Sequence, residues 1–190
     1  MLQLGCIRAK TQANVLRRET PFHCAAEIGR VKIGRRRQRT VSRNTAPLAP
    51  HSLEAQIRST IDSWAQAIRT KDAAGVSGQQ TPDFVQFDFA PPLQTIGPNP
   101  QGLQDWFATW RGPIGYELTE LRVTASEDVA FCHALIHMTG SRTDGSQSDV
   151  WFRNTLCLRK VGDAWKIAHG HESVPMYMDG SFKAAIDLKP

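Results

Sequence analysis

Two histidines separated by one residue, His169 and His171, are the side chains in this sequence best suited to chemistry. They lie in a stretch with the alternation of a β-strand, so we expect both to point inward with Trp165 and Ile167. The other face, which includes Glu172, is predicted to point outward. An imidazole can transfer a proton near neutral pH, and two on one strand could hold a zinc or iron ion. The alternative is a histidine that is only hydrogen-bonded in the core, and we predict no metal site.

Asp88 is the second candidate. It lies in the alternating segment Val85-Gln86-Phe87-Asp88-Phe89, which stops at Pro91-Pro92. A carboxyl group flanked by apolar residues can face a pocket, where burial raises its pKa and suits it to proton transfer. It can equally be a strand-end residue in water, and the sequence leaves both possibilities open.

Residues on neighbouring strand-like stretches could bind a substrate. Arg153 could orient an anionic or enolic group, or form a structural ion pair. Histidines in the preceding stretch could face a site, a sheet edge or a dimer contact. Together with tryptophans from helical stretches, the predicted substrate-binding residues are Trp64, Trp106, Trp151, Arg153, Thr155 and His133.

The elements that position these residues follow from periodicity. A stripe of apolar residues at helical spacing predicts a helix that begins after Ser52 and contains Leu53, Ile57, Ile61, Trp64 and Ile68. Further predicted elements are helices over 72–78 and 100–110 and strands over 84–89, 116–124, 128–139, 148–160 and 164–173. Helices followed by strands are typical of an α+β fold with the helices on one face of a curved sheet.

Charge is unevenly distributed along the 190 residues. The net charge is +5, yet residues 1–50 hold eleven Lys and Arg against two acidic residues. We expect residues 1–50 to be a disordered tail or to reflect a start site assigned too far upstream; a transit peptide or a nucleic-acid-binding arm are the alternatives. Residues 51–175 are predicted to form one mildly acidic domain, and residues 176–190 a C-terminal tail. This acidic balance makes nucleic acid an unexpected partner of the domain.

The sequence also carries signals about the compartment. No stretch of 18 or more apolar residues occurs, and the N-terminus lacks the apolar segment of a secretory signal. The four cysteines include no Cys-x-x-Cys pair, and a domain of this size needs no disulfide. We therefore expect a cytoplasmic protein without membrane association.

The order of these elements, the segment from Phe87 to Pro92, and the closing pattern Trp-x-Ile-x-His-x-His-x-Ser-Val-Pro over 165–175 resemble a known family. This is the SnoaL-like branch of the nuclear transport factor 2-like superfamily, which includes ketosteroid isomerase homologues. The resemblance covers residues 52–190 and implies a cystatin-like cone, with about three helices on a strongly curved, mainly antiparallel sheet. It also implies a homodimer and a pocket for a small hydrophobic or carbonyl-containing molecule, without a cofactor.

In ketosteroid isomerases a strand aspartate moves the proton next to a ketone, and Asp88 matches its position. The tyrosine of their oxyanion site corresponds to Trp64, and the assisting acid falls near Thr155 or Leu156. The indole of Trp64 could donate one hydrogen bond, but the pair of acidic donors does not carry over.

Two hypotheses follow. In the first, the chain is an isomerase-like or cyclase-like enzyme with Asp88 as general base, His169 or His171 as partner acid, and Arg153 and Trp64 orienting the substrate. In the second, it is a ligand-binding or dimerisation module of the same fold without catalysis.

Overall fold

The computed structural model describes residues 52–190, so the predictions for residues 1–50 lie outside the described residues. The helices are α1 (Leu53–Arg69), α2 (Ala73–Gly78) and α3 (Pro100–Ala108). The strands are β1 (Gln80–Phe87), β2 (Thr95–Ile96), β3 (Trp110–Ala125), β4 (Val129–Arg142), β5 (Gln147–Val161) and β6 (Ala164–Ser173). Within the described range, none of the helices has the length and apolar character needed to cross a membrane.

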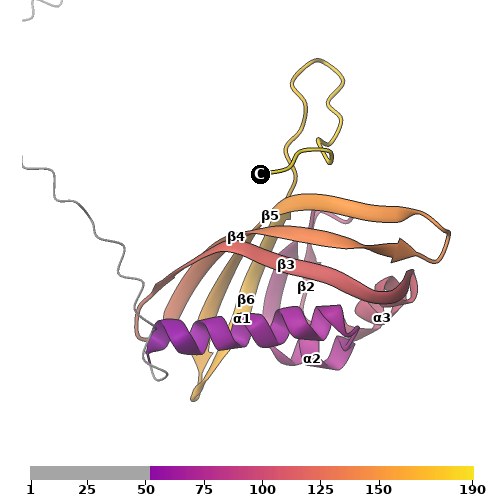
Figure 1. Ribbon diagram of the computed structural model, residues 1–190. Helices are drawn as coiled ribbons and strands as arrows, with labels where there is room; N and C mark the ends of the chain where they lie inside the picture. The colour runs from indigo at the N-terminus through magenta and orange to yellow at the C-terminus, as the bar shows by residue number, and fades with distance from the viewer. Residues whose placement is uncertain (1–51) are drawn as a thin grey trace, which may run out of the picture. The chain divides into compact units, whose positions relative to one another are not determined.

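Helix α1 forms where its apolar stripe predicts it. The side-chain oxygen of Ser52 accepts a hydrogen bond from the backbone N–H of Ala55 at 3.1 Å, which caps the first turn. Ile57 and Ile61 are fully buried, and Trp64 is nearly so. The stripe therefore faces the sheet, and the long strands bend around α1 (Figure 1).

The two shorter helices also begin at side-chain caps. Asp72 accepts from the N–H of Gly75 at 2.8 Å, and Asn99 accepts from the N–H of Gly102 at 2.9 Å. Pro100 occupies the first turn of α3, where its missing N–H has no intrahelical partner to lose.

A single six-stranded sheet forms the other layer, with strand order β2-β1-β6-β5-β4-β3. Neighbouring strands are antiparallel except β1 and β6, which run parallel. The predicted α+β class, with N-terminal helices on a curved and mainly antiparallel sheet, is confirmed (Figure 1).

A β-bulge in β6 changes which residues face the helices. Cys157 pairs with His169, but the next residue of β5, Leu158, pairs with Ile167, so Ala168 is an extra residue on β6. An extra residue reverses the alternation of every side chain beyond it. The prediction that His169 and His171 share the inner face of Trp165 and Ile167 is therefore wrong. Gly170 and Glu172 occupy that face instead, opposite the buried residues Leu156 and Asn154.

The chain after β6, residues 174–190, forms an arm that folds back on itself. Met176 and Ala184 form an isolated β-bridge, and the N–H of Ala185 donates to the carbonyl of Pro175 at 2.8 Å. Lys189 contacts Asp149 of β5 at 2.6 Å. Most of the apolar side chains of the arm remain exposed: Met176, Met178, Phe182, Ile186 and Leu188.

Candidate functional site

Three polar side chains from three different strands meet on the inner face of the sheet. The Tyr116 hydroxyl of β3 and the Asn154 amide of β5 each donate a hydrogen bond of 3.2 Å to Oε1 of Glu172 on β6. Tyr116 and Asn154 are each only 3% exposed. Strands β4 and β5 lie between β3, which carries Tyr116, and β6, which carries Glu172. The curvature of the sheet allows the long phenol side chain to span this separation.

Aromatic rings surround this cluster. Trp64 of α1 meets Tyr116 edge to face, with ring centroids 5.6 Å apart. Phe152 lies beside Tyr116 at 6.2 Å, and Phe89 packs on Phe152 at 4.9 Å. The polar atoms of the cluster are therefore held in apolar surroundings, where an unneutralised charge is costly.

These surroundings favour the protonated form of Glu172. Burial, and secondarily the negative charge of Asp88, raise the pKa of Glu172 to about 8, although the hydrogen bonds from Tyr116 and Asn154 oppose the shift. Burial also raises the pKa of Tyr116 well above its usual value, with the charge of Glu172 contributing. Both known donors point to Oε1, so a proton on Oε2 remains able to donate to a bound oxygen. Glu172 is only partly buried as a residue, so solvent still reaches it.

Asp88 lies at the edge of the same cluster. The parallel pairing of Gln86 with Gly170 and of Phe87 with His171 carries Asp88 to the level of Glu172. Asp88 is exposed, and one of its oxygens accepts a hydrogen bond from the N–H of Ala90 at 3.0 Å. Its charge is close enough to raise the pKa of both Glu172 and Tyr116.

Gly170 and Gln86 approach each other closely where β6 meets β1. A Cβ atom on Gly170 would lie 2.2 Å from Oε1 of Gln86, so only glycine leaves room for this side chain in its present position. Gln86 and Gly170 thus bring β1 and β6 together immediately before Asp88 and Glu172.

The two predicted catalytic histidines lie on the other face of the sheet. His169 Nδ1 is 2.8 Å from the carbonyl oxygen of Val85, and the ring of Phe87 meets the edges of His169 and His171 at 4.9 and 5.8 Å. The structure therefore joins both histidines to β1 and does not bring them together with Asp88 and Glu172.

The predicted substrate-binding residues are divided among three places. Trp64 joins the Glu172 cluster, whereas Trp106 packs on Phe107 and Trp110 near α3. Trp151 stacks on His137 on the outer face, with centroids 4.4 Å apart. The remaining three, Arg153, Thr155 and His133, lie together on that outer face.

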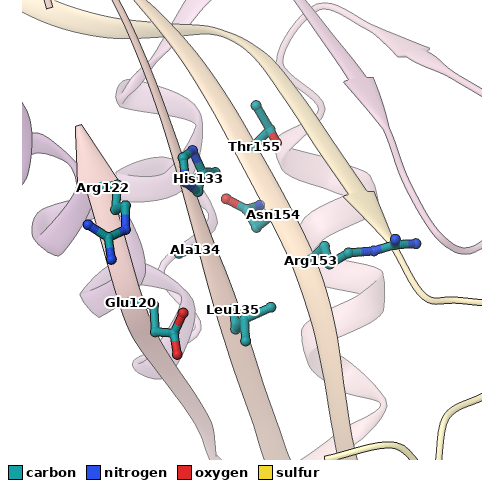
Figure 2. A pocket seen from close by; sticks show the side chains of 8 residues that line it. All are labelled: Glu120, Arg122, His133, Ala134, Leu135, Arg153, Asn154 and Thr155. Carbon is teal, nitrogen blue, oxygen red and sulfur yellow. The ribbon is translucent and has the colours of Figure 1, made fainter. Parts of the chain in front are cut away.

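This outer group lines a separate cavity of about 300 Å³, which we call the outer cavity (Figure 2). Its walls come from three adjacent strands: Glu120 and Arg122 of β3, His133, Ala134 and Leu135 of β4, and Arg153, Asn154 and Thr155 of β5. Sequence reasoning found three of these residues but expected them to share a site with Asp88.

Sequence reasoning missed Tyr116, Asn154 and Glu172. The available signal was Gly170, because a glycine inside a strand pattern indicates a bulge or a close backbone approach. Within residues 52–190, no group of three or more His, Cys, Asp or Glu side chains is arranged to hold a metal ion.

The comparisons with known proteins agree with this architecture. The sequence profile of the SnoaL-like domain matches residues 57–177. A nuclear transport factor 2-like protein of unknown function from Pseudomonas putida is 32% identical; the alignment covers 73% of this chain and 99% of that chain, with a TM-score of 0.64. No curated protein matches the sequence.

Two more distant structures share the fold alone. A nuclear transport factor 2-like superfamily protein from Salmonella enterica is 17% identical, covering 71% of this chain and 99% of that one, with a TM-score of 0.60. A protein of Novosphingobium aromaticivorans, named provisionally as a scytalone dehydratase, is 15% identical, covering 70% and 90%, with a TM-score of 0.59. From the profile match and the Pseudomonas relative, the chain belongs to the SnoaL-like family of the nuclear transport factor 2-like superfamily.

Proposed function

We propose that the chain binds a small, largely apolar carbonyl compound beside the Glu172 cluster and catalyses proton transfer next to the carbonyl group, as in an isomerisation or cyclisation. The observation that carries this proposal is the contrast between two neighbouring carboxyl groups. Glu172 is held protonated by burial, whereas Asp88 is exposed and acts on it as a negative charge. Two acids whose environments differ in this way can serve as acid and base in one reaction.

The chemistry assigns each group a step. Asp88 accepts the proton from the carbon next to the carbonyl, and the C–H electron pair moves into the substrate to form an enolate. The proton on Oε2 of Glu172 hydrogen-bonds to the enolate oxygen, while Tyr116 and Asn154 hold Oε1 in place. Glu172 thus takes the role of partner acid that sequence reasoning gave to His169 or His171, and Trp64 helps to fix Tyr116.

The experiment measures deuterium uptake at the α-carbon of a ketone panel, beginning with 2-tetralone, by NMR in D₂O with the full chain. We expect catalysed uptake of deuterium at the α-carbon, because the proton that Asp88 removes from the ketone can exchange with D₂O at this exposed carboxyl group. Asp88→Asn should slow the exchange about a hundredfold or more. The matched control is Asp83→Asn, which removes a carboxylate of the same strand that pairs with Arg159. Equal rates for Asp88→Asn and the parent protein would refute the assigned base.

A second candidate is a ligand-binding module of the same fold without catalysis. It is favoured by the hydrogen bond from Ala90 to Asp88, which gives the carboxylate a structural role in the turn after β1. Under this alternative, ketones bind and quench the tryptophan fluorescence of the chain, but no α-deuterium exchange exceeds that of buffer.

We further propose that the protein is a cytoplasmic homodimer. The two cysteines of the described region, Cys132 and Cys157, are free, which suits a reducing compartment. The support for self-association is the arm, which leaves five large apolar side chains exposed to solvent.

A further inference from the structure

We propose that Gln86 is a substrate-binding residue beside Glu172, and that the substrate is a β-keto amide, a carbonyl compound whose second carbonyl group belongs to a carboxamide. This inference rests on the function proposed above, because it names the class of carbonyl compound that reacts at the same site. The keto oxygen of the substrate accepts a hydrogen bond from Glu172, and its carboxamide pairs with the side-chain amide of Gln86.

Gln86 of β1 lies on the inner face of the sheet, in the row of residues next to Glu172. It pairs with Gly170 of β6, two residues before Glu172 on that strand. A Cβ atom on Gly170 would lie 3.1 Å from Cδ of Gln86, so the amide of Gln86 lies over the bare backbone of Gly170. Residues two apart on a strand are about 6.6 Å apart and share a face, which places this amide beside the Glu172 carboxyl group.

The inner-face residues on the other side of Gln86 belong to the hydrophobic core. Phe84 precedes Gln86 by two residues on β1, and Ile167, which pairs with Leu158, precedes Gly170 on β6. Phe84, Ile167 and Leu158 are each at most 5% exposed. The half-buried Gln86 is therefore a polar side chain at the boundary between the apolar core and the Glu172 cluster.

The side-chain amide of Gln86 has hydrogen-bonding capacity that the described part of the chain leaves unused. Among residues 52–190, its Nε2 donates one long hydrogen bond of 3.5 Å to the carbonyl oxygen of Phe87, and its Oε1 accepts none. One N–H donor and one acceptor therefore remain on the amide. A partly buried polar group is stabilised when it is paired, so this donor and acceptor are available to a ligand.

A second carboxamide is the group that complements this donor and acceptor. A carboxamide carries an N–H donor beside a carbonyl acceptor, so two amides can exchange two hydrogen bonds, as asparagine and glutamine side chains do with adenine. An ester of the same shape offers its carbonyl oxygen as an acceptor and has no N–H to donate. Gln86 should therefore prefer an amide to the corresponding ester.

A carboxamide at this position also suits the chemistry assigned to Asp88. A carboxylate is a weak base, and a carbon between two carbonyl groups gives up its proton more readily than a carbon beside a single ketone. Asp88 follows Gln86 by two residues and reaches the level of Glu172, so the carbon between the two carbonyl groups can face it. The C–H bond breaks, the proton passes to the Asp88 carboxylate, and the electron pair is shared by the two carbonyl groups. Their oxygens accept hydrogen bonds from Oε2 of Glu172 and Nε2 of Gln86.

The test is isothermal titration of the full chain with benzoylacetamide and with methyl benzoylacetate, in which an ester replaces the carboxamide. We expect the amide to bind in the millimolar range or tighter, and roughly tenfold more tightly than the ester. Gln86→Met keeps the shape of the side chain but can form neither hydrogen bond, so it should bind both compounds equally. Gln101→Met, at an exposed glutamine of α3, is the matched control and should keep the preference of the parent protein.

Several results would overturn the proposal. They are equal binding of the two compounds by the parent protein, no binding of benzoylacetamide in the millimolar range, a preference that survives in Gln86→Met, or its loss in Gln101→Met.

The failure of this inference can be told from the failure of the proposed function, because binding does not require proton transfer. If Gln86→Met loses the amide preference but Asp88→Asn exchanges deuterium at the rate of the parent protein, the assigned base is wrong and the carboxamide site stands. If Asp88→Asn slows the exchange and the parent protein shows no amide preference, only the carboxamide site is refuted.

Discussion

Glu172 owes its chemistry to neighbours that are distant in the sequence. Tyr116 lies 56 positions earlier and Asn154 18 positions earlier, yet both donate to the same carboxyl oxygen. The surrounding rings supply no charge to balance a carboxylate, so the neutral acid is favoured. The result is a carboxylic acid that can act as a hydrogen-bond donor at neutral pH.

The pKa of Glu172 predicts how the stability of the protein depends on pH. Its pKa is about 8 in the folded chain and 4.5 as an ordinary side chain. The folded state therefore binds this proton more tightly than the unfolded state. Its contribution to stability is complete below pH 4.5 and is lost as pH rises to about 8, on the order of a few kcal/mol.

Glu172→Gln replaces the neutral acid by an uncharged amide of similar shape and should flatten this dependence. The measurement is the free energy of unfolding in urea at about pH 5 and about pH 8.5, either side of the titration. Glu117→Gln, on the exposed face of β3, is the control and should keep the slope of the parent protein. Parallel slopes for Glu172→Gln and the parent protein would show that another group titrates.

At the scale of elements, one extra residue in β6 decides which of its side chains face the helices. Before Ala168 the inner residues are Trp165 and Ile167; after it they are Gly170 and Glu172. Without the bulge, the Glu172 carboxyl would leave the cluster and His171 would enter it.

Matched valine substitutions at two neighbouring positions test which residues of β6 face inward. Gly170→Val should destabilise the fold by about 1–3 kcal/mol, because the β-branched side chain enters a buried position and forces the Gln86 amide to move. His171→Val places a β-branched residue on the exposed face and should cost well under 1 kcal/mol. The measurement is the midpoint of urea unfolding. The reverse order of the two costs would favour the regular alternation expected from the sequence.

Periodicity predicted the elements better than it predicted their faces. The stripe of α1 is unbroken, and its packing confirms the predicted helix. In β6 the same kind of reasoning found the strand and misplaced His169, because alternation counts residues and a bulge adds one. The two-residue strand β2 is too short to produce a pattern, so periodicity could not detect it.

The candidate site was less accessible to sequence reasoning than the fold. Asp88 could be singled out because a carboxylate among apolar residues is a local feature. Tyr116 could not be, since its contact with Glu172 depends on the curvature of a sheet in which β4 and β5 lie between their strands. Arg153 was predicted to bind a ligand, but the face that it occupies depends on the strand register, which the sequence does not reveal.

At the scale of the whole described domain, the arm is the segment least accounted for by internal packing. Only Ala185 is well buried within it, and the ion pair of Lys189 with Asp149 is exposed and worth little in stability. The arm also extends past residue 177, where the match to the SnoaL-like profile ends. This apolar segment is the contact that we assign to the proposed homodimer.

Removal of residues 176–190 should therefore convert the proposed homodimer to a monomer. The measurement is light scattering during size-exclusion chromatography, with circular dichroism to verify that the sheet remains folded. Lys189→Ala, which removes the ion pair but keeps the apolar side chains, should remain a dimer. An unchanged mass after the deletion would mean that the arm does not mediate association.

The position of β6 between β1 and β5 has a consequence for how the protein is made. During synthesis β1 emerges early, but its long neighbour in the sheet is the strand that emerges last. Until residues 164–173 have left the ribosome, β1 has only the two-residue strand β2 to pair with, and one edge stays open. Until β6 inserts, the unpaired edge of β1 can pair with other polypeptides. Ribosome stalling within β6 would prolong this exposure and should therefore increase aggregation of the nascent chain.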